Sequence, residues 1–353
     1  MNISKSRFLQ AIIFWLTHCC QFAYPTSGNV PYLDTKNEHG ETPLHISSQN
    51  GNERITQLLL SLGANISATN ADGNTPLHLA VLYDSVNTTK LLLEHGADVS
   101  IKNDDGNDPF LIAATPELQN MEVMRFLIDS GASIDTINKD GDTALHIAIS
   151  CNNAPMTKLL LDHSADLSVA NSNGDTAMHL LAKNGYGNIF ELILNKSFDL
   201  NVQDKNGNTP LHIACWFDNV NVTIFLIENY ASVDSKNLDG NTPLFLAIWS
   251  GNAEAVEHLL NYGAYVNFVN SNGNTPLHEA ILRKKSHLVK LLLDHGADSK
   301  AVNGQGNLPL HLALFNDDTD TAEKLITFTN SNQDVDVHVT TTHTTVYGEY
   351  EDP

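Results

Sequence analysis

A four-residue phrase, Thr-Pro-Leu-His in its commonest form, recurs nine times and constrains the fold more than any other feature of the chain. Successive copies begin 33 residues apart, except for one step of 35 residues between the third and fourth copies. A period of this length indicates a repeat architecture, in which each repeat is one supersecondary unit. The copies begin at Thr42, Thr75, Asp108, Thr143, Thr176, Thr209, Thr242, Thr275 and Leu308.

The phrase predicts the start of a helix. Threonine supplies a hydroxyl acceptor at the N-cap, and proline suits the first helical position because its missing N–H has no helical partner there. Leucine at the third position and alanine at the sixth give an apolar stripe that a neighbouring helix can approach closely. A second apolar run, such as residues 90–93, predicts a second and antiparallel helix in the same repeat.

The ends of each repeat carry turn residues. A glycine closes the second helix in several copies, as at Gly63 and Gly263, where a left-handed residue is common. Ser164, Ser197 and Tyr230 replace this glycine in repeats four to six. We expect each to cost roughly 1 kcal/mol if it keeps the left-handed conformation. Asp-Gly or Asn-Gly pairs before most of the phrases predict hairpin turns.

The phrase TPLHxA, followed by an LLxxGAD segment such as residues 92–98, resembles the ankyrin repeat. The resemblance covers residues 37–328. A helix pair with a hairpin cannot bury both of its faces alone, so neighbouring repeats must stack. The fold expected is an all-α repeat solenoid of nine stacked helix-turn-helix units with hairpin loops. The resemblance also implies a concave groove that binds other proteins and a scaffold that generally has no catalytic centre.

The third repeat departs from the pattern. Asp108 stands where most copies have threonine, and Leu111 stands where most have histidine. Two extra residues near Pro116 predict a longer connection between its two helices.

Charge and cysteine content exclude several classes of protein. The chain has 19 basic and 41 acidic side chains, for a formal charge of −22. A binder of nucleic acid is excluded because phosphates are neutralised by lysine and arginine. The four cysteines are too few and too scattered for a disulfide framework or a zinc site with paired ligands. They are Cys19, Cys20, Cys151 and Cys215.

No catalytic, cofactor or metal site is predicted. The histidines of the phrase all occupy one repeat position, and the resemblance implies that they form structural hydrogen bonds near the hairpin. Their positions are His45, His78, His146, His179, His212, His278 and His311. No second histidine follows His278-Glu279 at the spacing of a zinc-protease helix.

The N-terminal segment suggests secretion. Lys5 and Arg7 precede the apolar run of residues 8–16, and polar residues follow it. This pattern predicts a signal peptide over residues 1–23, cleaved at about 19–23, because the run is shorter than the roughly 20 residues of a membrane span. An amphipathic or buried helix and an uncleaved anchor over residues 8–20 are the alternatives.

Two further segments lie outside the repeats. Residues 24–36 form a short linker, and residues 329–353 are rich in threonine and acidic residues without any apolar periodicity, which predicts a flexible tail. If the chain is secreted, four Asn-X-Ser/Thr triplets are candidate glycosylation sites. They begin at Asn65, Asn87, Asn195 and Asn221.

The eighth residue of each copy lies outside the shared pattern, and we expect it to face the groove. Repeats six to nine place large apolar residues there, and the ninth position adds an aromatic residue and an arginine. These residues are the predicted partner-binding surface: Trp216, Phe217, Trp249, Leu282, Arg283 and Phe315. Tryptophan and arginine are over-represented at binding hot spots. The alternative is that these side chains tilt inward and widen the core.

Three functions follow from these features. The first is a secreted, non-enzymatic protein that binds a partner protein and spans no membrane. The second is an intracellular scaffold or inhibitor similar to the IκB-type proteins, which thiols at Cys151 and Cys215 favour. The third is a secreted toxin or effector, because secreted ankyrin arrays resemble the repeat region of the latrotoxin family.

Overall fold

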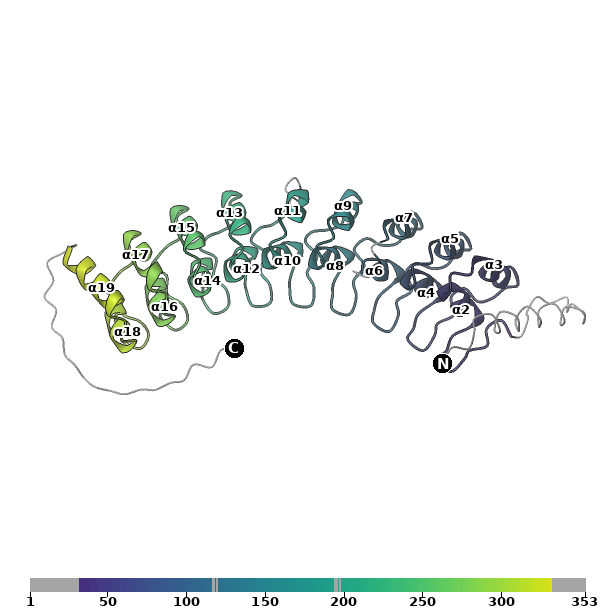
Figure 1. The fold of residues 1–353 in the computed structure, drawn as a ribbon, viewed down its shortest axis with the longest axis horizontal. Helices are drawn as coiled ribbons and strands as arrows, with labels where there is room; N and C mark the ends of the chain where they lie inside the picture. The colour runs from purple at the N-terminus through teal and green to yellow at the C-terminus, as the bar shows by residue number, and fades with distance from the viewer. Residues whose placement is uncertain (1–31, 116–117, 119, 194–195, 197, 332–353) are drawn as a thin grey trace, which may run out of the picture. The chain divides into compact units, whose positions relative to one another are not determined.

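The computed structural model describes residues 32–115, 118, 120–193, 196 and 198–331. Within these ranges all regular secondary structure is helical, and the helices pair as the repeat pattern predicts (Figure 1). The predicted signal peptide of residues 1–23, the linker before residue 32 and the tail beyond residue 331 lie outside the described residues. The last helix continues through residues 329–331, which the sequence pattern assigns to the tail.

The chain divides into two compact parts. Among the described residues, the first part takes those up to 172 and those within 188–196, and the second takes those within 173–187 and those after 197. Helices of the first part are α2 (Pro43–Gln49), α3 (Glu53–Ser61), α4 (Pro76–Leu82), α5 (Val86–Glu94), α6 (Pro109–Ala113), α7 (Met121–Asp129), α8 (Ala144–Ser150), α9 (Ala154–Asp162) and, but for its first residue, α11 (Gly187–Ile193).

The second part carries the other helices of the described residues. They are α10 (Ala177–Asn184), α12 (Pro210–Trp216), α13 (Val220–Glu228), α14 (Pro243–Ser250), α15 (Ala253–Asn261), α16 (Pro276–Leu282), α17 (Ser286–Asp294), α18 (Pro309–Phe315) and α19 (Thr319–Ser331).

Helices stack in two rows within each part. In the second part α10, α12, α14, α16 and α18 pack on one another in sequence, and α13, α15, α17 and α19 form the other row. The hairpin loops run along the side of the first row that faces away from α13, α15 and α17 (Figure 1). In the first part α2, α4 and α6 pack in the same way, with α3, α5 and α7 as the second row.

Each copy of the phrase begins a helix, as predicted. Thr75, for example, is the N-cap of α4, and its hydroxyl oxygen accepts a hydrogen bond from the His78 backbone N–H. The sixth-position alanines Ala80, Ala214 and Ala280 are fully buried, and their small side chains let neighbouring helices come close. The predicted long connection of the third repeat is also present, since residues 114–120 join α6 to α7 where residues 83–85 join α4 to α5.

The hairpins are tight turns that contact one another along the stack. Asp204 and Asn208 pair through a backbone hydrogen bond of 2.9 Å, and the Gly207 N–H donates to the Asp204 carbonyl oxygen. Gly207 has a φ of 77°, and a Cβ atom there would lie 2.8 Å from the Leu238 backbone nitrogen of the next hairpin. This close approach, together with the left-handed backbone, requires glycine at this position.

Left-handed residues close the second helices as expected. Gly263 has a φ of 89°, and Ser164 and Tyr230 keep the same conformation with φ values of 64° and 68°. Ser197 lies outside the described residues. Ser164 and Tyr230 therefore carry the backbone strain that the sequence predicts.

Candidate functional site

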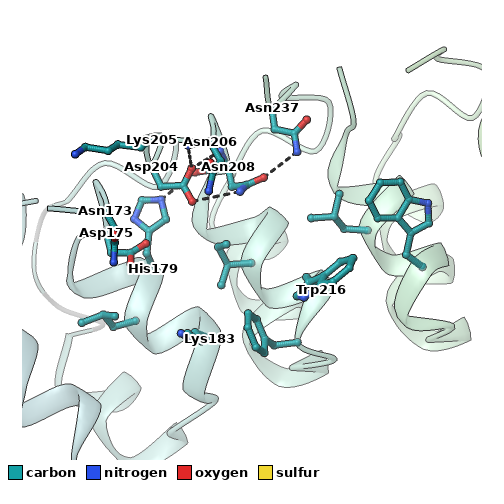
Figure 2. Close-up of a pocket in the computed structure, with 15 residues that line it drawn as sticks. Asn173, Asp175, His179, Lys183, Asp204, Lys205, Asn206, Asn208, Trp216 and Asn237 are labelled. Atoms are coloured by element: carbon teal, nitrogen blue, oxygen red, sulfur yellow. Dashed lines mark hydrogen bonds between the residues drawn. The ribbon is translucent and has the colours of Figure 1, made fainter. Parts of the chain in front are cut away.

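A pocket of about 570 Å³ lies in the second part of the chain, between the hairpins and the first-row helices. We call this pocket the groove. Its helical wall comes from α10, α12 and α14 and its other wall from three successive hairpins (Figure 2). The lining residues include the eighth-position side chains Lys183, Trp216 and Trp249, so these three lie where the sequence predicts a groove.

The aromatic residues of the groove contact one another and two cations. The Trp216 and Trp249 rings meet edge to face with centroids 5.8 Å apart. The Lys183 ammonium lies 5.6 Å from the Phe217 ring centre, and the Arg283 guanidinium lies 4.1 Å from the Trp249 ring centre. A cation therefore lies over the aromatic face of Phe217 and another over that of Trp249, an attractive arrangement in both cases.

Exposure differs among the predicted partner-binding residues. Trp216 and Phe217 are 47% and 44% exposed, and Trp249 is half-buried. Leu282 and Phe315 end α16 and α18 respectively, outside the lining of the groove, and Phe315 is 73% exposed. The structure thus brings Trp216, Phe217, Trp249 and Arg283 together, whereas Leu282 does not line the groove and Phe315 lies one repeat further along the stack.

The hairpin wall is polar, and its side chains are held by one another. The Asp204 carboxylate accepts hydrogen bonds from the backbone N–H groups of Asn206 and Asn208, each 2.8 Å long. The Asn237 side-chain amide donates to the Asn208 side-chain oxygen of the preceding hairpin at 2.9 Å (Figure 2). The groove therefore offers an ordered polar rim opposite an aromatic floor.

The sequence pattern does not predict that the fifth residue of three copies, counted from the first residue of the phrase, lines the groove. Leu180, Ile213 and Leu246 occupy this position in three successive copies and line the groove beside the tryptophans. Because these residues are apolar, their sequence pattern is that of core residues and gives no sign that they line the groove. Glu279 is the one acidic residue at the fifth position among the nine copies, and it is the sequence feature that sets this position apart from an ordinary core position.

The phrase histidines are structural, as the resemblance implies. The Nδ1 atom of His212 accepts a hydrogen bond from the Thr209 N–H at 3.1 Å, and its Nε2 atom lies 3.0 Å from the Asn241 carbonyl oxygen. Burial lowers the pKa of His212 and of His78 to about 4. These rings are neutral at pH 7 and join a helix start to the next hairpin.

The described ranges hold neither a metal-binding cluster nor a helix that could cross a membrane. No group of three or more His, Cys, Asp or Glu side chains there is arranged to hold a metal ion. None of the helices in the same ranges has the length and apolar character to cross a membrane. Cys215 is a buried thiol, and burial raises its pKa to about 12.

Paired helices, hairpins and a groove on the hairpin side define a helical repeat protein of the kind that binds other macromolecules. A family model for ankyrin repeats in three copies matches residues 9–103, 110–204, 182–270 and 263–339. These matches cover most of the chain, which therefore belongs to the ankyrin-repeat family. No curated protein matches the sequence. Proteins of this family are generally non-enzymatic modules for protein–protein interaction.

Proposed function

We propose that the chain is a non-enzymatic binding protein that holds a partner protein in the groove and along the surface from Trp216 to Phe315. The observation that carries this proposal is the exposure of Trp216 and Phe217 at the floor of a preformed pocket. Water contacts nearly half of each side chain, although both are large and apolar. Apolar surface of this kind, gathered in one place, marks interaction sites.

The charges beside the groove favour a partner segment with apolar anchors and an acidic flank. Lys183 borders one end of the aromatic floor, and Arg283 and Lys284 are exposed at the other. An acidic side chain of the partner can meet Lys183 while an apolar side chain covers Trp216. Cation and aromatic ring are then desolvated together, which strengthens both contacts.

We further propose that the protein acts outside the cell, on the basis of residues 1–23. The intracellular scaffold or IκB-like inhibitor is the alternative, and N-terminal sequencing of protein from its own cells separates the two. Loss of the first 19–23 residues supports secretion, and an intact Met1 end rejects it. For the toxin or effector alternative, leakage of dye from lipid vesicles is the expected activity.

Glycosylation is a second consequence of secretion. Asn65, Asn87 and Asn221 are exposed, and Asn195 lies outside the described residues. Asn65 lies in the turn after α3, whereas Asn87 and Asn221 lie within α5 and α13. Enzymatic removal of N-linked glycans from the native protein, followed by mass measurement, tests all four sites.

The binding proposal is tested by comparing the native chain with a Trp216→Ala variant as baits. A partner that the native chain captures and the variant loses is then purified, and its affinity for both chains is measured. Equal affinity for the two chains would reject the groove as the binding site. A Tyr230→Ala variant is a matched control, because Tyr230 is an aromatic residue of the same repeat that is 92% exposed and lies outside the groove.

A further inference from the structure

Glu279 occupies a position that is apolar in every other copy of the repeat. It is the fifth residue of the phrase, in the first turn of α16, and only 5% of its surface is exposed. An acidic side chain at a buried position is costly unless its oxygens are fully hydrogen-bonded. The other copies place these residues at the fifth position: Ile46, Leu79, Ile112, Ile147, Leu180, Ile213, Leu246 and Leu312.

Four donors meet the Glu279 carboxylate. The side-chain amides of Asn270 and Asn274 donate to its Oε1 atom at 3.1 and 2.9 Å. The Trp249 indole N–H donates to Oε2 at 2.9 Å, and the Arg283 Nε–H donates to the same oxygen at 3.3 Å. Both oxygens are therefore occupied, one by the hairpin before α16 and the other by two residues of the predicted partner-binding surface.

The carboxylate fixes the geometry of Trp249 and Arg283 relative to each other. One oxygen anchors both side chains, and the anchored guanidinium lies over the indole ring. The opposite neighbour of Trp249 is Trp216, in edge-to-face contact. The orientation of the tryptophan pair thus depends on a side chain that does not itself line the groove.

We infer that Glu279 is a positioning residue for the binding surface, one that holds Trp249 and Arg283 in a single preset arrangement. This inference rests on the proposed binding function, since it assigns Glu279 a role in that same surface. Preset side chains lose less conformational freedom when a partner binds, so preorganisation raises affinity.

The repeat itself supplies an argument against a purely structural role. A leucine at the fifth position serves repeats two, five, seven and nine, so the stack forms without an acid there. Replacing every member of a buried ion pair by apolar side chains is commonly neutral for stability or stabilising, whereas removing one member alone leaves its partners without an acceptor and destabilises. In Glu279→Leu the side chain has the size that other repeats accept at this position, but four donors lose their acceptor, so we expect a lower melting temperature together with the loss of the shared anchor of Trp249 and Arg283.

The test measures the solvent exchange of the tryptophan indole N–H protons by NMR in the full chain. The protein has three tryptophans, so Trp216→Phe and Trp249→Phe variants assign the signals. In Glu279→Leu we expect the Trp249 indole proton to exchange about tenfold faster than in the native chain, because its acceptor is gone. Glu279→Gln keeps the side-chain shape but has one acceptor oxygen, and we expect an intermediate rate.

Glu257→Leu is the matched control. It removes the same charge from the exposed face of α15 in the neighbouring repeat, and the Trp249 exchange rate should stay at the native value. Thermal unfolding followed by circular dichroism is run on all variants. If Glu279→Leu lowers the melting temperature but leaves the Trp249 exchange rate unchanged, Glu279 stabilises the packing of the repeats without positioning Trp249, and the inference is wrong.

The outcome is independent of whether the groove binds a partner. Fast exchange in Glu279→Leu together with no binding by the native chain supports the positioning role and rejects the proposed function. Native and variant chains with the same exchange rate reject the positioning role, whatever the groove binds. Should Glu279→Leu fail to fold, an unchanged exchange rate in Glu279→Gln gives the same rejection.

Discussion

The Nε2 atom of His212 lies 3.0 Å from the carbonyl oxygen of Asn241, which is 29 residues further along the chain. The Thr209 N–H donates to Nδ1 of the same ring, so the proton of the neutral imidazole resides on Nε2 and is donated to Asn241. Equivalent bonds join His45 to Asn74, His78 to Asn107, His179 to Asn208 and His278 to Asn307. Protonation of Nδ1 would place its N–H against the Thr209 N–H, which is also a donor. The strength of these histidine contacts therefore depends on pH.

We predict that stability falls as the pH drops from about 6.5 to about 4, and the upper part of this interval lies above the pKa values of ordinary carboxylates. Burial lowers the pKa of His78 and His212 to about 4 in the folded chain. The unfolded chain therefore binds more protons than the folded chain over this interval. Each of the two residues contributes up to about 3 kcal/mol that is fully present above pH 6.5 and lost as the pH falls towards the folded pKa. Urea unfolding followed by tryptophan fluorescence at several pH values measures this slope.

The control for the acid effect is His212→Gln. Glutamine cannot titrate, so the variant is expected to be less stable at pH 7 but to lose less stability between pH 6.5 and pH 4 than the native chain. Equal slopes for the two proteins would show that His212 does not contribute to the acid sensitivity.

Tyr230→Gly should stabilise the second part of the chain by about 1 kcal/mol, because Tyr230 holds a left-handed φ of 68° with its side chain exposed. The reverse change, Gly263→Ala, should destabilise by a similar amount through the backbone alone, since no atom lies within 4 Å of the added Cβ. Amide hydrogen exchange at the end of α13 should slow in Tyr230→Gly. An unchanged exchange rate there would contradict the claim that Tyr230 strains the backbone.

Gly207→Ala should cost more than Gly263→Ala. Its added Cβ would lie 2.8 Å from the Leu238 backbone nitrogen, so two hairpins must move apart in addition to the left-handed strain. We expect a loss of more than about 2 kcal/mol, measured by chemical unfolding of both variants under the same conditions. If both variants lose a similar free energy of unfolding, the two hairpins can move apart at little energetic cost and the prediction is wrong.

Trp216→Ala should weaken partner binding by about 2 kcal/mol and leave the melting temperature nearly unchanged, because the side chain is half-exposed. Trp249→Ala should weaken binding and also lower the melting temperature, since it removes the donor to Glu279 and the ring beneath Arg283. Titration calorimetry with the identified partner and thermal unfolding separate the two effects. Melting of the stack by Trp216→Ala would assign that side chain to the core.

Cys215 should resist alkylation in the folded chain. Its thiol is buried, and burial raises its pKa to about 12, so the reactive thiolate is scarce at neutral pH. Mass spectrometry after treatment with iodoacetamide should find Cys215 unmodified in buffer and modified in denaturant. Rapid modification in buffer would indicate local opening of α12.

The sequence predicts the helices well because each of their signals is local. The N-cap threonine, the proline and the closing left-handed residue lie within the element that they define, so Thr75 and Gly263 act as their patterns indicate. The groove is predicted less completely. Trp216 and Lys183 lie in it, but the lining by Leu180, Ile213 and Asp204 depends on the register between stacked repeats. The role inferred for Glu279 has the same origin, because its donors come from α14, from the C-cap of α16 and from the hairpin that precedes α16.

The histidine bonds end on backbone carbonyl groups, which every repeat possesses, so repeats joined in this way can in principle be copied or exchanged as whole modules. The seventh and eighth repeats are different. Phe245 replaces the histidine in the seventh repeat, and a hydrogen bond from Trp249 to Glu279, an acid found at this position in no other copy, connects the two repeats. A duplication or recombination whose boundary falls between them would separate donor from acceptor. This pair must therefore be transferred as one piece for a rearranged array to keep its binding surface.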